Sequence, residues 1–200
     1  MKRRESIKQM LINLTFVLPQ ANIYAKSDGR YKELLVFLNS KNYYLNDELP
    51  IPSFKEISVE TGLTVDKLRK QIKNLYLGLV DSFNGFSFDF GKTEVIFTAE
   101  FLKNYASFKT NNIKFIPRVG ENIEIPFFKA KIGISMFYVK DVRHSFINNQ
   151  QIIDIRLHSG LYNKYSHFRL DKALATGEVG RLELYNSSEF EIMNRLGITS

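Results

Sequence analysis

The chain has 200 residues, carries a formal net charge of +7 at pH 7, and contains neither cysteine nor tryptophan. The absence of cysteine excludes disulfide bonds, thiolate metal sites and cysteine nucleophiles. Apolar residues make up 44% of the chain, with 17 Phe and 10 Tyr, so packed structure rich in strands is expected rather than disorder. The length allows one large or two small domains, and the positive charge suits a polyanionic partner.

The first 40 residues contain one ambiguous segment and one clear helix. From Ser6 to Leu18 the apolar residues fit a helical face, with Ser6 and Gln9 as a capping box, but those after Met10 also alternate as in a strand. A helix is expected from about Asp28 to Ser40. The basic opening and the short apolar run resemble a signal peptide. Polar residues interrupt that run and no small-x-small cleavage site follows, so we expect a cytoplasmic protein.

The stretch from Pro52 to Leu75 predicts two short helices joined by a glycine turn. Ser53 can cap the first helix while Glu56 reaches back to the cap, and Gly62 supplies the left-handed residue that ends it. Thr64 caps the second helix. Residues of the second helix recur at helical spacing on an inner stripe, namely Val65, Leu68, Ile72 and Leu75. The outer face is polar and basic and holds Lys67, Lys70, Gln71 and Asn74, flanked by Arg69 and Lys73.

This stretch resembles the helix-turn-helix of bacterial DNA-binding proteins, of the winged-helix type, over about residues 52–97. The matching residues are Phe54, Ile57, Ser58, Gly62, Leu63, Thr64, Leu68 and Ile72. Ser58 is a departure, since the family most often has Ala at that position. The resemblance implies a fold and a mode of binding in which the second helix enters the DNA major groove. The alternative is a helical hairpin that only packs in a core or docks another protein.

A wing is expected directly after the second helix. Phe86, Phe88 and Phe90 alternate with polar residues as in a half-buried strand, and Gly91-Lys92 can form a two-residue hairpin turn. Lys92 at the tip of this hairpin would touch backbone phosphate. The alternative is an ordinary hairpin with a solvated lysine.

From about Glu94 onward the pattern changes to short strands. Val95 to Phe108 is expected to be a long strand with a short helical turn within 99–105, and 122–128 another strand. Asn148-Asn149 is expected to turn the chain, since both residues tolerate positive φ. After that turn, Ile153, Ile155 and Leu157 would face the core. Without intervening helices these strands predict a small antiparallel sheet, either barrel-like or curled. Helices are expected near 166–175 and 188–196, the latter with a Ser188/Glu191 capping box.

Catalytic patterns are not found. The three histidines, His144, His158 and His167, lack metal-site spacing, and no phosphate-binding glycine loop or nucleophile elbow occurs. We therefore expect neither an enzyme nor a cofactor. The segment 161–169 interleaves Tyr162, Tyr165 and Phe168 with basic residues. Such aromatic residues can stack on nucleic-acid bases, but the favoured interpretation is that the rings pack against the sheet.

The sequence thus predicts an α+β protein with a winged helix-turn-helix over 1–92 and a β-rich domain with C-terminal helices over 93–200. The function expected is sequence-selective binding of double-stranded DNA, as a transcriptional regulator or as a replication or partition factor of a plasmid or other mobile element. The DNA-contacting residues would be Thr64, Lys67, Arg69, Lys70, Gln71, Lys73, Asn74 and Lys92. The second domain would sense a ligand, form a homodimer or recruit a partner, and no membrane association is expected. The alternative is a non-enzymatic adaptor whose helical hairpin docks a protein.

Overall fold

The computed structural model describes residues 6–41, 43, 49–81, 86–180, 182–187 and 189–198. The chain divides into two compact units, which are described separately below. The first comprises the residues up to Glu94 together with His144–Ile153. The second comprises Val95–Arg143 and the residues from Asp154 onward.

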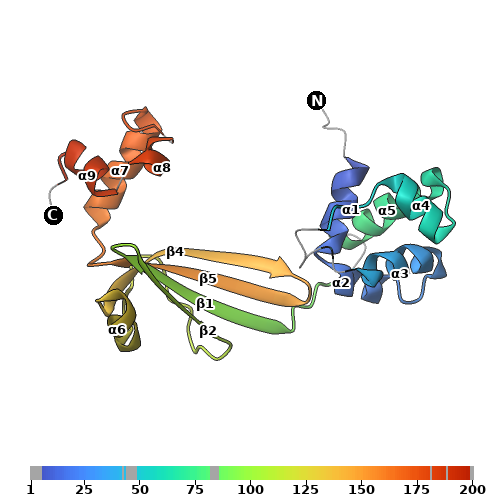
Figure 1. The fold of residues 1–200 in the computed structure, drawn as a ribbon, viewed down its shortest axis with the longest axis horizontal. Coiled ribbons are helices and arrows are strands. Elements are labelled where there is room, and N and C mark those ends of the chain that lie inside the picture. Colours follow the sequence, from blue (N-terminus) through green and yellow to red (C-terminus); the bar gives the residue numbers. More distant parts are fainter. Residues whose placement is uncertain are drawn as a thin grey trace. The chain divides into compact units, whose positions relative to one another are not determined.

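The first unit is built on helices (Figure 1). They are α1 (Ile7–Thr15), α2 (Leu18–Tyr24), the 3-10 turn η1 (Gly29–Tyr31), α3 (Lys32–Ser40), α4 (Phe54–Thr61) and α5 (Val65–Val80). The ambiguous N-terminal segment is therefore helical, and the hydroxyl of Ser6 accepts from the backbone N–H of Gln9 at 3.4 Å. In this helical conformation, α1 buries Met10, Leu11 and Leu14 on one stripe that faces the core.

The local geometry expected for α4 and α5 is confirmed. Ser53 and Glu56 form both hydrogen bonds of a capping box, and Gly62 ends α4 with φ of 68°. In the turn the hydroxyl of Ser58 donates to the carbonyl of Leu63 at 2.5 Å, while the Leu63 side chain is buried. Thr64 then caps α5 by accepting from the N–H of Lys67. The two helices and the turn between them are thus specified by capping groups at each junction.

The expected wing hairpin is not formed by the described residues. Residues 86–91 form no strand, Gly91 lacks positive φ, and Lys92 is the first residue of strand β1 (Lys92–Phe101) rather than a turn residue. The phenylalanines instead make ring contacts in succession: Phe86 with Phe88 at 5.3 Å between centroids, and Phe88 with Phe90 at 5.9 Å. Phe86 also meets Tyr24 of α2 at 5.4 Å. Packing on the helical core has replaced strand pairing in this segment.

A five-stranded sheet follows. Its strands are β1, β2 (Asn104–Thr110), β3 (Asn122–Glu124), β4 (Met136–Ile147) and β5 (Gln150–Ser159), in the order β2-β1-β5-β4-β3. The β1–β2 and β3–β4 pairs are antiparallel, but the sheet as a whole is mixed and open. The prediction of a wholly antiparallel, barrel-like sheet is therefore wrong. Its two edges are β2 and the three-residue β3, which do not pair with each other.

The turns between strands were predicted with mixed success. Asn148 and Asn149 both have positive φ, 48° and 61°, which confirms the tight turn between β4 and β5. The helical turn expected within 99–105 is wrong, because Leu102 and Lys103, with φ of 47° and 69°, form a tight turn between β1 and β2. The strand expected to reach residue 128 ends at Glu124, and Pro126 opens the 3-10 turn η3 (Pro126–Phe128).

The second unit contains the rest of the sheet and the terminal helices. Ile153, Ile155 and Leu157 are buried as expected, and η3 leads into the short helix α6 (Lys129–Ile132), which the sequence analysis did not predict. The C-terminal helices are α7 (Lys164–Thr176), α8 (Glu183–Asn186) and α9 (Glu189–Arg195). Two of these match the predicted helices. Ser188, the expected capping residue, lies outside the described residues.

The boundary expected after residue 92 can be compared with the two compact units. They divide at 94/95, and the turn between β4 and β5 is grouped with the helices. Within the first unit the N–H of Asn148 donates to the carbonyl of Phe16 at 2.8 Å, and Phe146 meets Phe90 at 5.0 Å between ring centroids. Independent folding of 1–92 stays a prediction.

Candidate nucleic-acid interface

Helix α5 separates an apolar inner side from a polar outer side. Leu68, Ile72 and Leu75 are fully buried in the core of the first unit. Lys67, Lys70, Lys73 and Asn74 are exposed, which agrees with their assignment to the outer face. Because the inner side is held by the core, the direction in which these side chains leave the helix is fixed by the packing.

One part of this outer face lines a groove. The groove has a volume of about 400 Å³ and lies between α5 and the η1 turn. Lys67, Lys70 and Asn74 line one side of it, and Arg30 and Glu33 line the other. The groove is thus lined by three cationic side chains and one carboxylate, an excess of positive charge that attracts anions.

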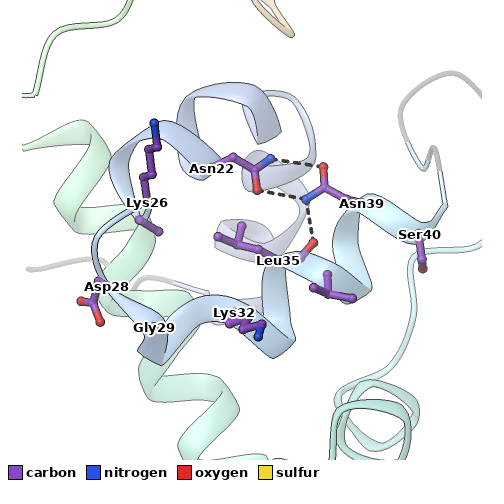
Figure 2. A pocket seen from close by; sticks show the side chains of 10 residues that line it. Asn22, Lys26, Asp28, Gly29, Lys32, Leu35, Asn39 and Ser40 are labelled. Atoms are coloured by element: carbon purple, nitrogen blue, oxygen red, sulfur yellow. Dashed lines mark hydrogen bonds between the residues drawn. The ribbon is translucent and has the colours of Figure 1, made fainter.

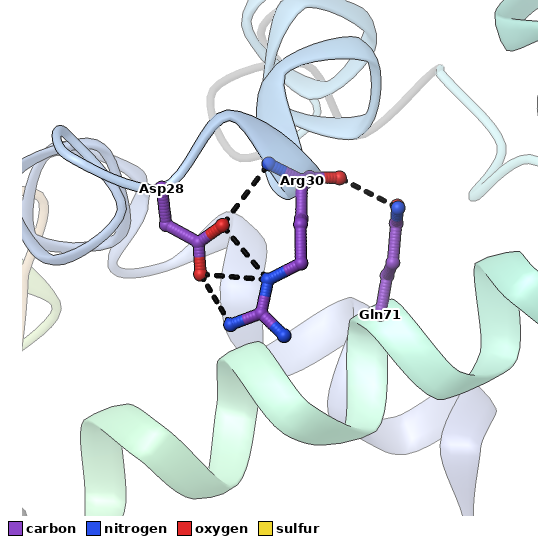
Figure 3. Close-up of polar contacts among 3 residues, drawn as sticks. All are labelled: Asp28, Arg30 and Gln71. Atoms are coloured by element: carbon purple, nitrogen blue, oxygen red, sulfur yellow. Dashed lines mark hydrogen bonds and ion pairs between the residues drawn. The ribbon is translucent and has the colours of Figure 1, made fainter.

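Gln71 does not belong to the exposed face. Its side chain is only 7% exposed, and its Nε2 donates to the backbone carbonyl of Arg30 at 2.6 Å (Figure 3). Among the residues that the structure describes, the buried Oε1 has no hydrogen-bond partner. The carbonyl of Arg30 requires a donor, so the amide orientation is fixed. Gln71 lines the groove, but its side chain joins α5 to η1 and is almost fully covered, so a base-contacting role for Gln71 stays a prediction.

Arg30 is a candidate contact residue that the sequence analysis missed. Its guanidinium makes bidentate hydrogen bonds to the carboxylate of Asp28, with distances of 2.6 to 3.0 Å (Figure 3). The hydrogen bond from Arg30 lowers the pKa of Asp28, and the same contact raises the pKa of Arg30. Arg30 was overlooked because it lies 41 residues before Gln71, and no local pattern links a turn before α3 to the outer face of α5.

The remaining predicted site residues lie elsewhere on the first unit. Arg69 leaves the opposite flank of α5, where its guanidinium carbon lies 5.4 Å from the ring centre of Phe54 and its Nη1 is 3.9 Å from Asp66. Thr64 is exposed, but its hydroxyl is engaged in the helix cap. Lys92 is exposed at the start of β1. The structure brings Lys67, Lys70 and Asn74 together, and it places Arg69 and Lys92 apart from them.

A second, wider hollow lies between α2 and α3 (Figure 2). Its volume is about 580 Å³, and Lys26 and Lys32 are among its lining residues. Asn22 and Asn39 cross it with reciprocal hydrogen bonds of 3.1 and 3.2 Å. Asn22 also donates to the carbonyl of Leu18, and Asn39 to that of Leu35. The two amides are thus satisfied within the protein, and their hydrogen bonds explain how α2 is held against α3.

The described histidines and carboxylates form no metal-binding cluster. No group of three or more His, Asp or Glu side chains among them could hold a metal ion. His144 is exposed, and its Nδ1 pairs with Nε2 of Gln151 at 3.0 Å. His167 stacks on Tyr162 with 4.6 Å between ring centroids. Within the part of the chain that the structure covers, no helix has the length and apolar character needed to cross a membrane.

The chain was compared with protein families, curated proteins and solved structures. No family model, no curated protein and no solved structure matches the chain.

Proposed function

We propose that the chain binds double-stranded DNA through the helix-turn-helix formed by α4 and α5. The observation that carries the proposal is the capped α4–Gly62–α5 unit, which buries Leu68, Ile72 and Leu75 while α5 exposes lysines along its outer face. A helix held in this way, after a short glycine turn, suits entry into the major groove.

The contacts proposed follow the geometry of the outer face. Lys67, Lys70 and Asn74 line the groove beside η1, so they and Arg30 form the side that meets the duplex. Asn74 is suited to read an adenine edge, because an amide can donate and accept at once. Lys67, Lys70 and Lys73 supply phosphate contacts, which position the protein without reading sequence. Gln71 has no contact role in this proposal, and no wing contributes.

The biological role proposed is that of a transcriptional regulator, or of a replication or partition factor of a plasmid or other mobile element. Both roles need sequence-selective binding, and both are consistent with an interface that combines an amide and several cations on one helix. The DNA that flanks the gene for this chain is the first target to test, because such proteins commonly bind there.

A salt titration tests the proposal. The full chain is titrated against labelled duplexes, including the flanking DNA, and the dissociation constant is followed as the salt concentration rises. With these three phosphate contacts, log K should fall with log salt with a slope of about −2.7. Binding that is undetectable at low salt would contradict the proposal. A protein-docking surface on α5, which is the alternative, predicts no such dependence for its partner.

A further inference from the structure

Helix α7 of the second unit is amphipathic, and one of its sides is buried within that unit. Ala173 is fully buried in a cluster with Val179, Ile192 and Leu196, and Leu170 and Leu174 pack against the same cluster. Gly177 ends α7 with φ of 75°. The orientation of the helix about its own axis is therefore fixed by this cluster.

The opposite side, here termed the α7 outer face, carries large side chains that stay exposed in the part of the unit that the structure describes. Tyr165 is 66% exposed and Phe168 is 67% exposed. Lys164, Asp171 and Lys172 are exposed on the same side of the helix. The expectation that the rings of 161–169 pack against the sheet holds for Tyr162, which contacts Tyr138 at 5.5 Å between centroids, but it is wrong for Tyr165 and Phe168.

The sequence of the α7 outer face is complementary to itself in the antiparallel direction. Lys164 and Asp171 lie four residues before and three residues after Phe168. If two copies of α7 pack antiparallel about a two-fold axis at Phe168, Lys164 of one copy comes beside Asp171 of the other, since both lie about 5 Å along the helix from the axis. A two-fold axis produces this ion pair twice.

The flank of the same face follows the same symmetry. Tyr165 and Lys172 lie three residues before and four residues after Phe168, and at 100° per residue they project on the same flank. The two-fold axis places this flank of one helix beside the same flank of the other helix. The ammonium of Lys172 therefore meets the ring of Tyr165 in the other copy. Such a contact is a cation–π interaction. The two Phe168 rings meet at the centre.

We propose that the α7 outer face binds a second copy of this chain, with the two α7 helices antiparallel and Phe168 at the two-fold axis. A nucleic-acid strand is the less suitable occupant, because Asp171 places a carboxylate on this face. The exposed rings bury roughly 500 Å² in total in such a pair, which places the contact among small and weak interfaces. The expected dimer therefore forms only at elevated concentration in the absence of DNA.

The test is the self-association of the full chain without DNA, measured by sedimentation equilibrium from low micromolar to submillimolar concentration. The wild-type chain should dimerise, and Phe168→Ser should weaken dimerisation at least about tenfold, because both central rings are lost. Val59→Ser is the matched control, since Val59 is 77% exposed on α4 of the other unit. It should leave dimerisation unchanged.

Charge exchange tests the antiparallel register itself. Lys164→Asp and Asp171→Lys should each weaken dimerisation by about fivefold to thirtyfold, because each replaces two attractions by two repulsions. The double variant Lys164→Asp/Asp171→Lys restores opposite charges and should recover most of the wild-type constant. Circular dichroism confirms that every variant is folded. A monomeric wild-type chain, single variants that dimerise normally, or a double variant without recovery would each overturn the proposal.

Discussion

Helices α5 and α7 use their exposed sides differently, although both bury the opposite side in a core. The exposed side of α5 carries lysines and an asparagine, and its apolar residues are all at least partly covered apart from Val80 at its end. The exposed side of α7 carries Tyr165 and Phe168 among charges of both signs. The first arrangement suits a polyanion, and the second suits a protein surface. What each helix leaves uncovered, more than the charge of the whole chain, indicates the kind of partner.

The proposed difference between the exposed sides of α5 and α7 is tested most strongly by reversing the charge of α5. Lys67→Glu/Lys70→Glu replaces two phosphate attractions by repulsions, and both side chains are exposed, so folding should change little. Affinity for duplex DNA should fall roughly 100-fold, and the salt slope should decrease by about 2. Electrophoretic shift and fluorescence anisotropy measure both quantities.

The matched control for this charge reversal lies on the second unit. Lys129→Glu/Lys131→Glu on α6 changes the net charge by the same amount, and both of its lysines are exposed as well. It should lower DNA affinity far less. If both double variants weaken binding equally, the effect comes from overall charge and α5 is not the interface.

Two glycines allow the turns that follow α4 and α7 to be compared directly. Gly62 and Gly177 have φ of 68° and 75°, and a Cβ at either position would meet nothing within 4 Å. A β-branched residue is disfavoured at such φ values, so Gly62→Val and Gly177→Val should each lose about 1–3 kcal/mol of stability. Thermal unfolding measures the loss. Gly62→Val should also weaken DNA binding, whereas Gly177→Val should not, and the reverse result would exchange the roles given to the two helices.

Local signals allowed the geometry around α5 to be predicted, whereas contacts distant in sequence were missed. The Ser53/Glu56 capping box, the Gly62 turn and the Asn148-Asn149 turn depend on residues within a few positions of each other, so periodicity and capping rules were enough. The alternation of Phe86, Phe88 and Phe90 also fits a strand. Phe86 and Phe88 instead pack against the helical core, a contact that no local pattern predicts.

In the candidate site, too, the features set by local patterns were predicted and the contacts between distant residues were missed. The sequence separates the inner and outer sides of α5, and Lys67, Lys70 and Asn74 are exposed as expected. Gln71 lies at the border between the two sides, and a helical wheel cannot show that η1 covers it. The hydrogen bond from Gln71 to the carbonyl of Arg30 links residues 41 positions apart, and the same turn brings Arg30 to the groove.

A smaller effect is expected on sequence discrimination, where the two amide side chains of α5, Gln71 and Asn74, should differ. Asn74→Ala should reduce discrimination between target and non-target duplexes about tenfold, because an exposed amide that reads a base edge is removed. Gln71→Leu should leave discrimination nearly unchanged, since its side chain is 7% exposed and faces the carbonyl of Arg30. Competition binding with both duplexes measures the ratio. Lost discrimination in Gln71→Leu with the fold intact would restore Gln71 to the interface.

The smallest effect concerns the acid dependence of the contact that holds the end of α7. The carboxylate of Glu178 accepts two hydrogen bonds from the guanidinium of Arg169, at 2.6 and 2.8 Å, and these bonds lower the pKa of Glu178 below 4.5. A carboxyl whose pKa is lower in the folded state stabilises the fold above its unfolded pKa, and this contribution is lost as the pH falls through the folded pKa.

Glu178→Gln removes this contribution and serves as the comparison for the acid dependence. At neutral pH the variant should unfold at a slightly lower temperature than the wild-type chain, and the difference should disappear as the pH falls below 4.5. Thermal unfolding at a series of pH values measures the difference, and a carboxyl-detected NMR titration locates the midpoint for Glu178. The effect should stay small, because Glu178 is exposed to water, where ion pairs contribute little. Dimerisation near neutral pH should be unchanged, since Arg169 and Glu178 are not part of the α7 outer face. A midpoint at or above 4.5 would show that this pair does not hold the end of α7.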